Sequence, residues 1–356
     1  MSTSLDYLNK EDAAVLLESP NSIVPSYATL LDSSKIRNVN HRTLGKSGLE
    51  VSVVGLGCNN FGMRIDLEAT RKVVDKAIDL GITLFDTADI YGNMGGSETM
   101  LGQVLGARRK DIVLATKFAG PMWEGVTRRN ASRRYIMTAV EASLRRLQTD
   151  WIDLYQLHFP DPLTPMEETL GALDDLVRQG KVRYIGCSNL PAWKMVESQW
   201  IAREGGLSRF ISAQDEYSLI ARHHEMEKLP AIEAYGMGLL PYFPLACGLL
   251  TGKYKRGENA PAGSRFAGIQ RLAERYSTDA NWTLVEHLES FCAARNHKLL
   301  ELAFSWLLSK PFVSSVIAGA TKPEQLEANV QAADWKLTAE DLAEIDRMPR
   351  GHVNPL

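Results

Sequence analysis

From about Val53 onward the chain alternates short β-branched runs with longer segments in which apolar residues recur at helical spacing. This alternation is typical of βαβ units and a parallel sheet. The helical segment that begins at Met166 ends on a glycine, as helix C-termini often do. The expected strands span residues 53–57, 83–89, 112–118, 152–158, 182–189, 211–219, 238–246 and 314–320. Eight strand and helix repeats predict an α/β fold of the closed (β/α)8 TIM barrel type rather than an open doubly wound sheet.

Three segments fall outside this rhythm. Residues 1–41 are rich in Ser, Asn and Asp, and their apolar piece DAAVLLES is too short for a stable isolated helix. We expect an N-terminal extension there, ahead of a barrel domain of residues 42–356; whether it covers the barrel, extends a subunit contact or is disordered stays open. HRTLGKSGLEVS predicts a hairpin that caps the barrel floor. Residues 247–281, after the seventh strand, form a long loop of the kind that is usually functional or disordered.

Composition narrows the function. The chain is 45% hydrophobic and 23% charged, so it can bury a large core, and its net charge of -3 argues against nucleic acid or an anionic membrane as a partner. No two cysteines stand in a C-x-x-C pair, which argues against a disulfide framework or a zinc site. The N-terminus lacks the pattern of a signal peptide, and no apolar run is long enough to span a membrane. We expect a cytoplasmic protein that acts on small molecules, with homo-oligomerisation left open.

Polar residues at the predicted strand ends suggest chemistry, because barrel active sites lie at the carboxyl ends of the strands. Asp86 interrupts an apolar strand in FDTADIYG, and Tyr91 follows five residues later. Lys117 lies near the end of IVLATKF, and His158 ends IDLYQLH. The spacings between these strands each match about one βα unit, so we expect the four side chains around one rim.

A buried ammonium needs an anion, and Asp86 is the available partner of Lys117. This pair alone would also suit a structural ion pair, and a lone histidine such as His158 is more often a hydrogen-bonded structural residue than a catalyst. A phenol beside the pair favours a catalytic role over a structural one. Because a nearby cation favours the phenolate form, we expect the pKa of Tyr91 to fall from about 10 toward neutrality. The constellation predicts a proton-donating site.

The motifs FDTADIYG, SETMLG, LATKF, YQLH and IGCSNL, in this order, resemble those of the aldo-keto reductase superfamily over residues 42–348. PLACGLLTGKY followed by SRF is most similar to the branch with potassium-channel β subunits and their bacterial relatives. The resemblance implies a catalytic tetrad of Asp86, Tyr91, Lys117 and His158, NADPH extended across the barrel mouth, and no metal. GLGCNNFG lacks the G-x-G-x-x-G spacing, so we do not expect a Rossmann domain.

The resemblance also implies cofactor contacts. Ser188, Asn189 and Gln214 match the carboxamide-binding residues, and Tyr242 matches the ring stacked on the nicotinamide. The pyrophosphate would lie over Pro244, Leu245, Ala246 and Cys247 under Lys253 and Arg265, and the 2'-phosphate and adenine beside Gly319, Thr321, Gln325 and Asn329. Cys58, Asp86, Phe243 and Gly248 complete the expected set.

Two positions depart from the family pattern. Gln325 stands where other branches carry an arginine for the 2'-phosphate, and Ala328 where the channel-subunit branch carries a glutamate. We still expect NADPH rather than NADH, because Lys253, Arg265 and Lys322 supply positive charge and the helix start near Pro323 suits an anion.

The implied activity is hydride transfer from NADPH to the carbonyl of an aldehyde, ketone or keto-sugar, with Tyr91 as proton donor, His158 polarising the carbonyl, and the reverse reaction an alcohol dehydrogenase. The residues near the rim that we expect to contact a substrate, with ordinary loop packing as the alternative, are Phe61, Met63, Arg64, Trp123 and Phe159.

A regulatory subunit that senses NADPH and turns over slowly is a rival function, although that branch carries asparagine at the place of His158. A Schiff-base lyase that uses Lys117 would require this lysine to be free of Asp86.

Overall fold

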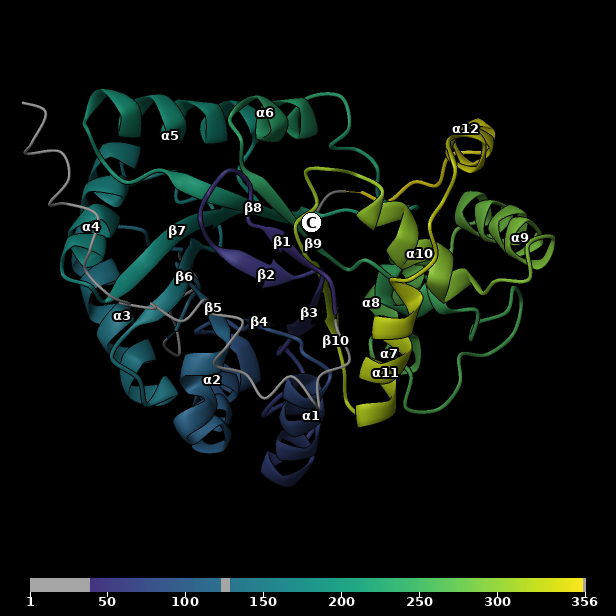
Figure 1. Cartoon of the computed structure of the whole chain (residues 1–356), viewed down its shortest axis with the longest axis horizontal. Helices are drawn as coiled ribbons and strands as arrows, with labels where there is room; N and C mark the ends of the chain where they lie inside the picture. Colours follow the sequence, from purple (N-terminus) through teal and green to yellow (C-terminus); the bar gives the residue numbers. More distant parts are fainter. Residues whose placement is uncertain (1–38, 123–128, 355–356) are drawn as a thin grey trace, which may run out of the picture. The chain divides into compact units, whose positions relative to one another are not determined.

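The computed structural model describes residues 39–122 and 129–354 of the chain (Figure 1). The expected N-terminal extension therefore lies almost wholly outside the described residues, as does Trp123. The described residues form one compact unit by their internal contacts.

Eight parallel strands form the predicted barrel. In the order in which they pair they are β10 (Val316–Gly319), β3 (Val54–Gly57), β4 (Leu84–Asp86), β5 (Val113–Phe118), β6 (Ile152–Leu157), β7 (Val182–Ser188), β8 (Phe210–Glu216) and β9 (Gly238–Tyr242). The sheet closes between its two outer strands, because the Leu239 amide donates to the Phe312 carbonyl (2.7 Å) and the Ser314 amide donates to the Leu239 carbonyl (3.0 Å). The predicted (β/α)8 fold is confirmed.

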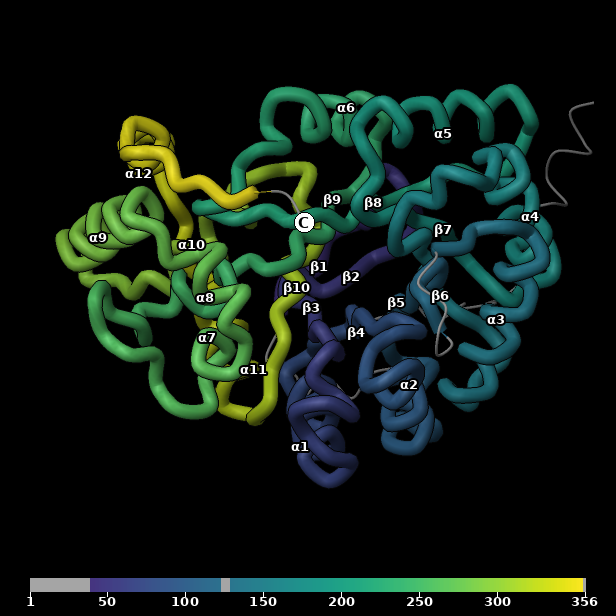
Figure 2. Tube along the Cα trace, turned by 180° about the vertical axis from the view of Figure 1, so that it is seen from behind, coloured from purple at the N-terminus to yellow at the C-terminus, as the bar shows by residue number. Residues whose placement is uncertain are grey.

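The helices flank the strands (Figures 1 and 2). They are α1 (Leu67–Asp79), α2 (Tyr91–Leu105), η2 (Gly106–Asp111), α3 (Arg133–Leu147), α4 (Met166–Arg178), α5 (Ala192–Glu204), α6 (Lys228–Ala234), α9 (Asp279–Ala293), α10 (Leu299–Leu308), α11 (Pro323–Ala332) and α12 (Ala339–Arg347). Local sequence fixes several of their starts: Asp66 caps α1 by accepting the Ala69 amide, and Ser132 caps α3 by accepting the Tyr135 amide. Apolar residues of α1 and α3, such as Val73 and Val140, are buried in the main hydrophobic core.

The predicted hairpin is present, as β1 (His41–Thr43) and β2 (Glu50–Ser52). Its apolar residues Leu44 and Val51 are buried with side chains from the barrel strands, namely Leu84, Ala115, Leu154, Leu240 and Ile317. At Gly45, where φ is +59°, an added Cβ would lie 2.5 Å from the Gly236 carbonyl oxygen, so the turn can approach the barrel only as glycine. The hairpin seals the amino-terminal end of the barrel and leaves the carboxyl end for a site.

The long segment after β9 is partly helical, with η3 (Ala246–Thr251), α7 (Arg265–Gly268) and α8 (Gln270–Tyr276). The strand that was predicted to reach residue 246 ends at Tyr242, because Phe243, Ala246 and Cys247 take positive φ values of 50°, 46° and 56°. The far end of the segment is fixed to β8: the Arg275 guanidinium meets the Glu216 carboxylate through contacts of 2.9 and 2.6 Å. This segment is therefore ordered over the mouth of the barrel.

Candidate active site

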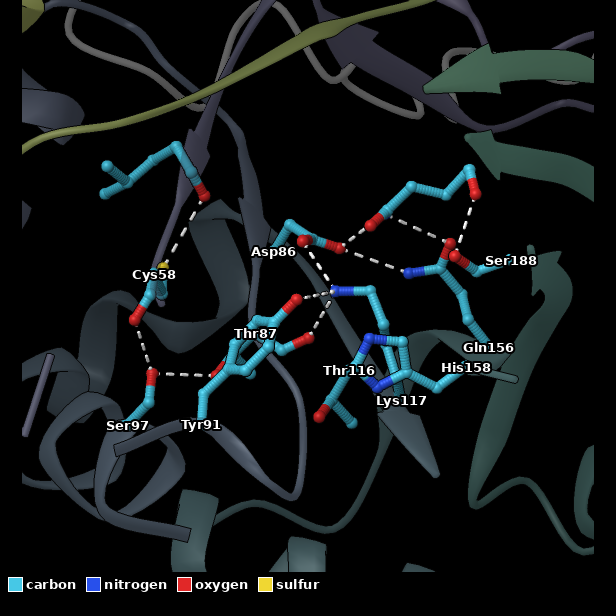
Figure 3. Close-up of polar contacts among 12 residues, drawn as sticks. Cys58, Asp86, Thr87, Tyr91, Ser97, Thr116, Lys117, Gln156, His158 and Ser188 are labelled. Carbon is cyan, nitrogen blue, oxygen red and sulfur yellow. Dashed lines mark hydrogen bonds and ion pairs between the residues drawn. The ribbon is translucent and has the colours of Figure 1, made fainter. Parts of the chain in front are cut away.

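A buried cation lies at the centre of the barrel mouth (Figure 3). Lys117 Nζ is 2.7 Å from Asp86 Oδ2, donates to the Thr87 carbonyl oxygen (2.9 Å), and lies 3.4 Å from the Tyr91 hydroxyl. Strand register explains the meeting: Asp86 pairs with Ala115, and Lys117 stands two residues further on the same inward face. The Lys117 side chain is 0% exposed and that of Asp86 4%, so the charges interact out of water.

The second oxygen of the Asp86 carboxylate is held by two amides. Gln214 Nε2 donates to Asp86 Oδ1 at 2.8 Å and Gln156 Nε2 at 3.2 Å. Sequence reasoning missed Gln156, although its place two residues before His158 puts both side chains on one face of the strand. The carboxylate is fully hydrogen-bonded, which makes this buried ion pair tolerable and fixes its geometry.

Burial lowers the pKa of Lys117, but the Asp86 carboxylate and the Tyr91 phenol raise it by more, so its net pKa lies above the usual value. The lysine is therefore an ammonium at neutral pH. The Schiff-base reading needed this amine free of Asp86, and the 2.7 Å ion pair contradicts it.

A tight turn aims Tyr91 at the lysine. Gly92, Asn93 and Met94 directly after it have left-handed φ values of 68°, 58° and 63°. An added Cβ on Gly92 would lie 2.5 Å from both the Phe61 carbonyl oxygen and the Ser97 amide nitrogen. Only glycine fits at this position, so the sequence Tyr-Gly fixes where the phenol lies.

The expected fall in the pKa of Tyr91 is wrong. Burial raises its pKa above the ordinary value, and the opposing effect of the Lys117 ammonium does not overcome this. The phenol is therefore protonated at neutral pH. A protonated phenol beside a fixed ammonium is suited to donate its proton, because the cation stabilises the phenolate that remains.

His158 lies beside the phenol as a neutral ring. The two ring centroids are 5.7 Å apart in an edge-on arrangement. Burial, followed by the charges of Lys117 and Arg129, lowers the pKa of His158 well below its usual value. Its Nδ1 is buried and has no hydrogen-bond partner in the described part of the chain, unlike an ordinary structural histidine.

A cavity of about 710 Å³ opens above these residues. The expected cofactor residues that line it are Cys58, Asp86, Ser188, Asn189, Gln214, Tyr242, Phe243, Pro244, Leu245, Cys247, Gly248, Lys253, Arg265, Gly319, Thr321, Gln325 and Asn329. Ala246 does not line it and is fully buried behind the wall. The strand ends thus bring residues from both halves of the chain to one cavity.

A hydrogen-bonded chain forms one wall of the cavity. Ser188 Oγ donates to the Gln214 carbonyl (2.8 Å), Asn189 Nδ2 donates to Ser188 Oγ (3.0 Å), and the Tyr242 hydroxyl donates to Asn189 Oδ1 (2.8 Å). Asn189 takes a φ of 58°, which asparagine tolerates better than most residues. The wall presents fixed amide and hydroxyl groups, which suits an amide-bearing ring.

The cavity is positively charged. Its lining, among the described residues, holds Arg64, Arg129, Lys253 and Arg265, whereas its one carboxylate, Asp86, is already paired with Lys117. Arg265 reaches Asn60 Oδ1 (3.3 Å), a contact that the sequence did not indicate. At the start of α11 the Gln325 side chain accepts the Thr321 and Lys322 amides, at 2.7 and 3.2 Å. An elongated anionic ligand with an amide-bearing ring fits this donor set.

Some of the residues expected to contact a substrate line the cavity and others do not. Phe159 and Arg64 line the cavity, while Phe61 is buried in the main core and Met63 is 58% exposed outside the lining. Phe61 was misplaced because an apolar residue in a short loop can turn inward, and its burial comes from contacts distant in sequence. Arg129 also lines the cavity, whereas its sequence, with an arginine directly before it, is typical of a solvated helix face.

Over residues 39–122 and 129–354, no group of three or more His, Cys, Asp or Glu side chains is placed to hold a metal ion. In the same residues, no helix has the length and apolar character that crossing a bilayer requires.

Fold and site together define a TIM barrel with an ion pair and a phenol at the base of a positively charged cavity. Residues 53–349 match the Aldo/keto reductase family. The chain is 38% identical over 303 residues to a protein named probable voltage-gated potassium channel subunit beta from Oryza sativa subsp. japonica, covering 83% of this chain and 91% of that one. It is 37% identical over 309 residues to the uncharacterized oxidoreductase YrpG of Bacillus subtilis (84% and 92% covered). It is 34% identical over 330 residues to L-glyceraldehyde 3-phosphate reductase of Escherichia coli K12 (89% and 94% covered).

This chain belongs to the aldo/keto reductase family and is an oxidoreductase of the TIM barrel fold. The resemblance read from the motifs, including the branch with the channel β subunits, is confirmed.

Proposed function

We propose that this protein is an NADPH-dependent reductase that converts an aldehyde, ketone or keto-sugar to an alcohol, and that Tyr91 is its proton donor. One observation carries the proposal: the partly buried, protonated phenol of Tyr91 lies 3.4 Å from an ammonium that Asp86 fixes, at the base of a cationic cavity. In the reverse direction the same groups would oxidise an alcohol, as an alcohol dehydrogenase does.

NADPH, when bound, supplies the hydride. The chain's own part would be to hold the cofactor: Ser188, Asn189 and Gln214 line the cavity and would bind the carboxamide, and Lys253 and Arg265 would bind the phosphates. These positively charged side chains are the reason for proposing NADPH, which carries an additional phosphate, rather than NADH.

Proton delivery is the task of the buried cluster. The Tyr91 hydroxyl donates its proton to the carbonyl oxygen, and the Lys117 ammonium stabilises the phenolate that remains. Asp86 keeps Lys117 charged and in place. Because the Lys117 and Asp86 side chains are only 0% and 4% exposed, their charges act in a low effective dielectric and need no reorganisation as the reaction proceeds.

The neutral His158 ring orients the substrate. A neutral imidazole offers one N–H donor, which polarises the carbonyl oxygen beside the phenol without competing as a stronger acid. Its low pKa keeps it in this form across the neutral range.

A regulatory role is the second candidate, favoured by the relative named as a potassium channel subunit beta. In that reading NADPH occupancy changes how the protein meets a partner, and catalysis is slow. Asp86, Tyr91 and His158 line one cavity and Lys117 is paired with Asp86 behind it (Figure 3), which favours the enzyme. The cytoplasmic location and the oligomeric state stay predictions.

The test is NADPH oxidation, followed by absorbance, against aldehydes, diketones, keto-sugars and glyceraldehyde 3-phosphate, with NADH in parallel. Rapid turnover with one class of carbonyl and a preference for NADPH would support the proposal. Tight NADPH binding without turnover of any compound would favour the regulatory role instead.

A further inference from the structure

The substrate end of the cavity holds a cation that neither the proton donor nor the cofactor requires. Arg129 lines the cavity beside His158 and Phe159. Its guanidinium carbon lies 4.4 Å from the centre of the Phe159 ring, and that ring stacks on His158 at 4.1 Å between centroids, with an interplanar angle of 15°. The stack places the guanidinium one ring away from the histidine that faces the reacting carbonyl.

Arg129 has no ion pair or side-chain hydrogen bond with any other residue of the described chain. Two arginines of the neighbouring helix α3 are paired: Arg133 with Asp175, and Arg146, whose Nε lies 2.7 Å from Glu98 Oε2. Stacking on Phe159 orients the guanidinium plane but uses none of its five N–H donors. These donors form a fork that matches a carboxylate or a phosphate.

The other cavity cations lie elsewhere. Lys253 and Arg265 belong to the long segment after β9, and Arg64 donates to the Gly263 carbonyl of that same segment at 2.7 Å. Arg129 acts instead at the reacting end, where its charge is among the causes that lower the pKa of His158, after burial and Lys117. If the long segment binds the phosphates of a dinucleotide, those phosphates lie away from Arg129 and its guanidinium stays unpaired.

We propose that Arg129 binds an anionic group of the substrate, so that the preferred substrates are small aldehydes or ketones carrying a phosphate or a carboxylate a few carbons from the carbonyl. This inference rests on the proposed reductase function. The carbonyl lies between Tyr91 and His158, and the anion reaches across the Phe159 ring to the guanidinium.

The test compares kcat/KM for charged and uncharged substrates of similar size: glyceraldehyde 3-phosphate against glyceraldehyde, and succinic semialdehyde against butanal. The wild type is expected to prefer the anionic member of at least one pair by about 10- to 100-fold, the range of a charge-assisted hydrogen bond. The pair with the larger preference tells phosphate from carboxylate. Arg129→Gln is expected to remove the preference, because kcat/KM for the anionic substrate should fall about 10- to 100-fold further than kcat/KM for the uncharged partner.

Two further variants sharpen the test. Arg134→Gln removes the same charge from an exposed position five residues away that does not line the cavity, and it should keep the full preference. Arg129→Lys keeps the charge but not the fork, and it should retain only part of the preference. Thermal unfolding and NADPH titration of each variant would show that fold and cofactor binding are intact.

Equal efficiency toward charged and uncharged substrates in the wild type would overturn the inference, as would an Arg129→Gln effect that is the same for both. If no carbonyl is reduced at all, the proposed function fails instead. The inference then still has a test without turnover: calorimetric titration of the NADP-saturated protein with glycerol 3-phosphate and with glycerol. Equal affinity for the two would contradict a role for Arg129 in anion binding.

Discussion

Lys117→Met removes the buried cation while keeping a side chain of similar length. In the wild type Lys117 Nζ lies 2.7 Å from Asp86 Oδ2 and both side chains are withdrawn from water, at 0% and 4% exposed. Methionine cannot replace the charge or the hydrogen bond to the Thr87 carbonyl oxygen (2.9 Å). The variant therefore leaves the Asp86 carboxylate buried with only the Gln156 and Gln214 amides to solvate it.

The cost follows from that geometry. Removing one partner of a buried pair typically costs about 3–5 kcal/mol, because the other charge is left without compensation. With an unfolding entropy of about 2.1 cal/mol/K per residue, a 356-residue chain should melt roughly 4–7 °C lower. Carbonyl reduction should also fall steeply, because the phenolate left on Tyr91 loses its stabilising charge.

Calorimetric melting of the wild type, Lys117→Met, Asp86→Asn and the double variant measures the coupling between the two groups. The double variant should melt above Lys117→Met, since the asparagine side chain that Asp86→Asn introduces is uncharged and still accepts the glutamine amides, yet it should stay inactive. If Lys117→Met has the melting temperature of the wild type, or if the double variant melts at no higher temperature than Lys117→Met, the reasoning about the buried pair is refuted.

Three other predictions concern the turn, the histidine and the cofactor. Gly92→Ala should lose much of its turnover and keep NADPH binding, because the added Cβ would lie 2.5 Å from backbone atoms and displace Tyr91. Gly180→Ala, at φ +74° with open space around it, is the control for left-handed strain alone. Steady-state rates that fall equally in both variants would contradict the role of Gly92 in positioning Tyr91. The folded pKa of His158 lies well below the value of about 6.5 expected for the unfolded chain, so the unfolded state takes up the proton first and stability is lost as pH falls below that value. Between about pH 7 and 5, urea unfolding should show that the free energy of unfolding falls further for the wild type than for His158→Gln, and equal losses would argue against a buried neutral ring. Arg265→Ala should weaken NADPH binding about tenfold or more in a fluorescence titration, with a smaller effect at high salt, and an unchanged Kd would remove Arg265 from the phosphate site.

Much of the fold could be predicted from the sequence, because period-two and helical apolar patterns report which face of each element is buried. The eighth unit shows this well: residues 314–320 were expected and β10 spans Val316–Gly319. Strand ends were less predictable. The run through Phe243 to Ala246 reads as a strand, and only the backbone shows that positive φ values end it at Tyr242.

At the site, the sequence indicated the residues on strand ends better than their surroundings. Asp86 and Lys117 were predictable because a charge inside a barrel demands a partner. The pKa of Tyr91 was not, since its direction depends on how completely the loop buries the phenol. Gln156 and Arg129 were missed because their roles come from side chains far away in sequence, Asp86 for one and Phe159 for the other.

The most direct test of the central claim is Tyr91→Phe, which removes one hydroxyl and keeps the ring that packs edge-on to His158. NADPH titration by fluorescence and single-turnover reduction of the best carbonyl substrate would be measured on the same preparation. Tyr91 as the proton donor predicts an NADPH Kd within about twofold of the wild type and a reduction rate lower by about 10²-fold or more. A variant that reduces the carbonyl at the wild-type rate would contradict the assignment of Tyr91 as the acid.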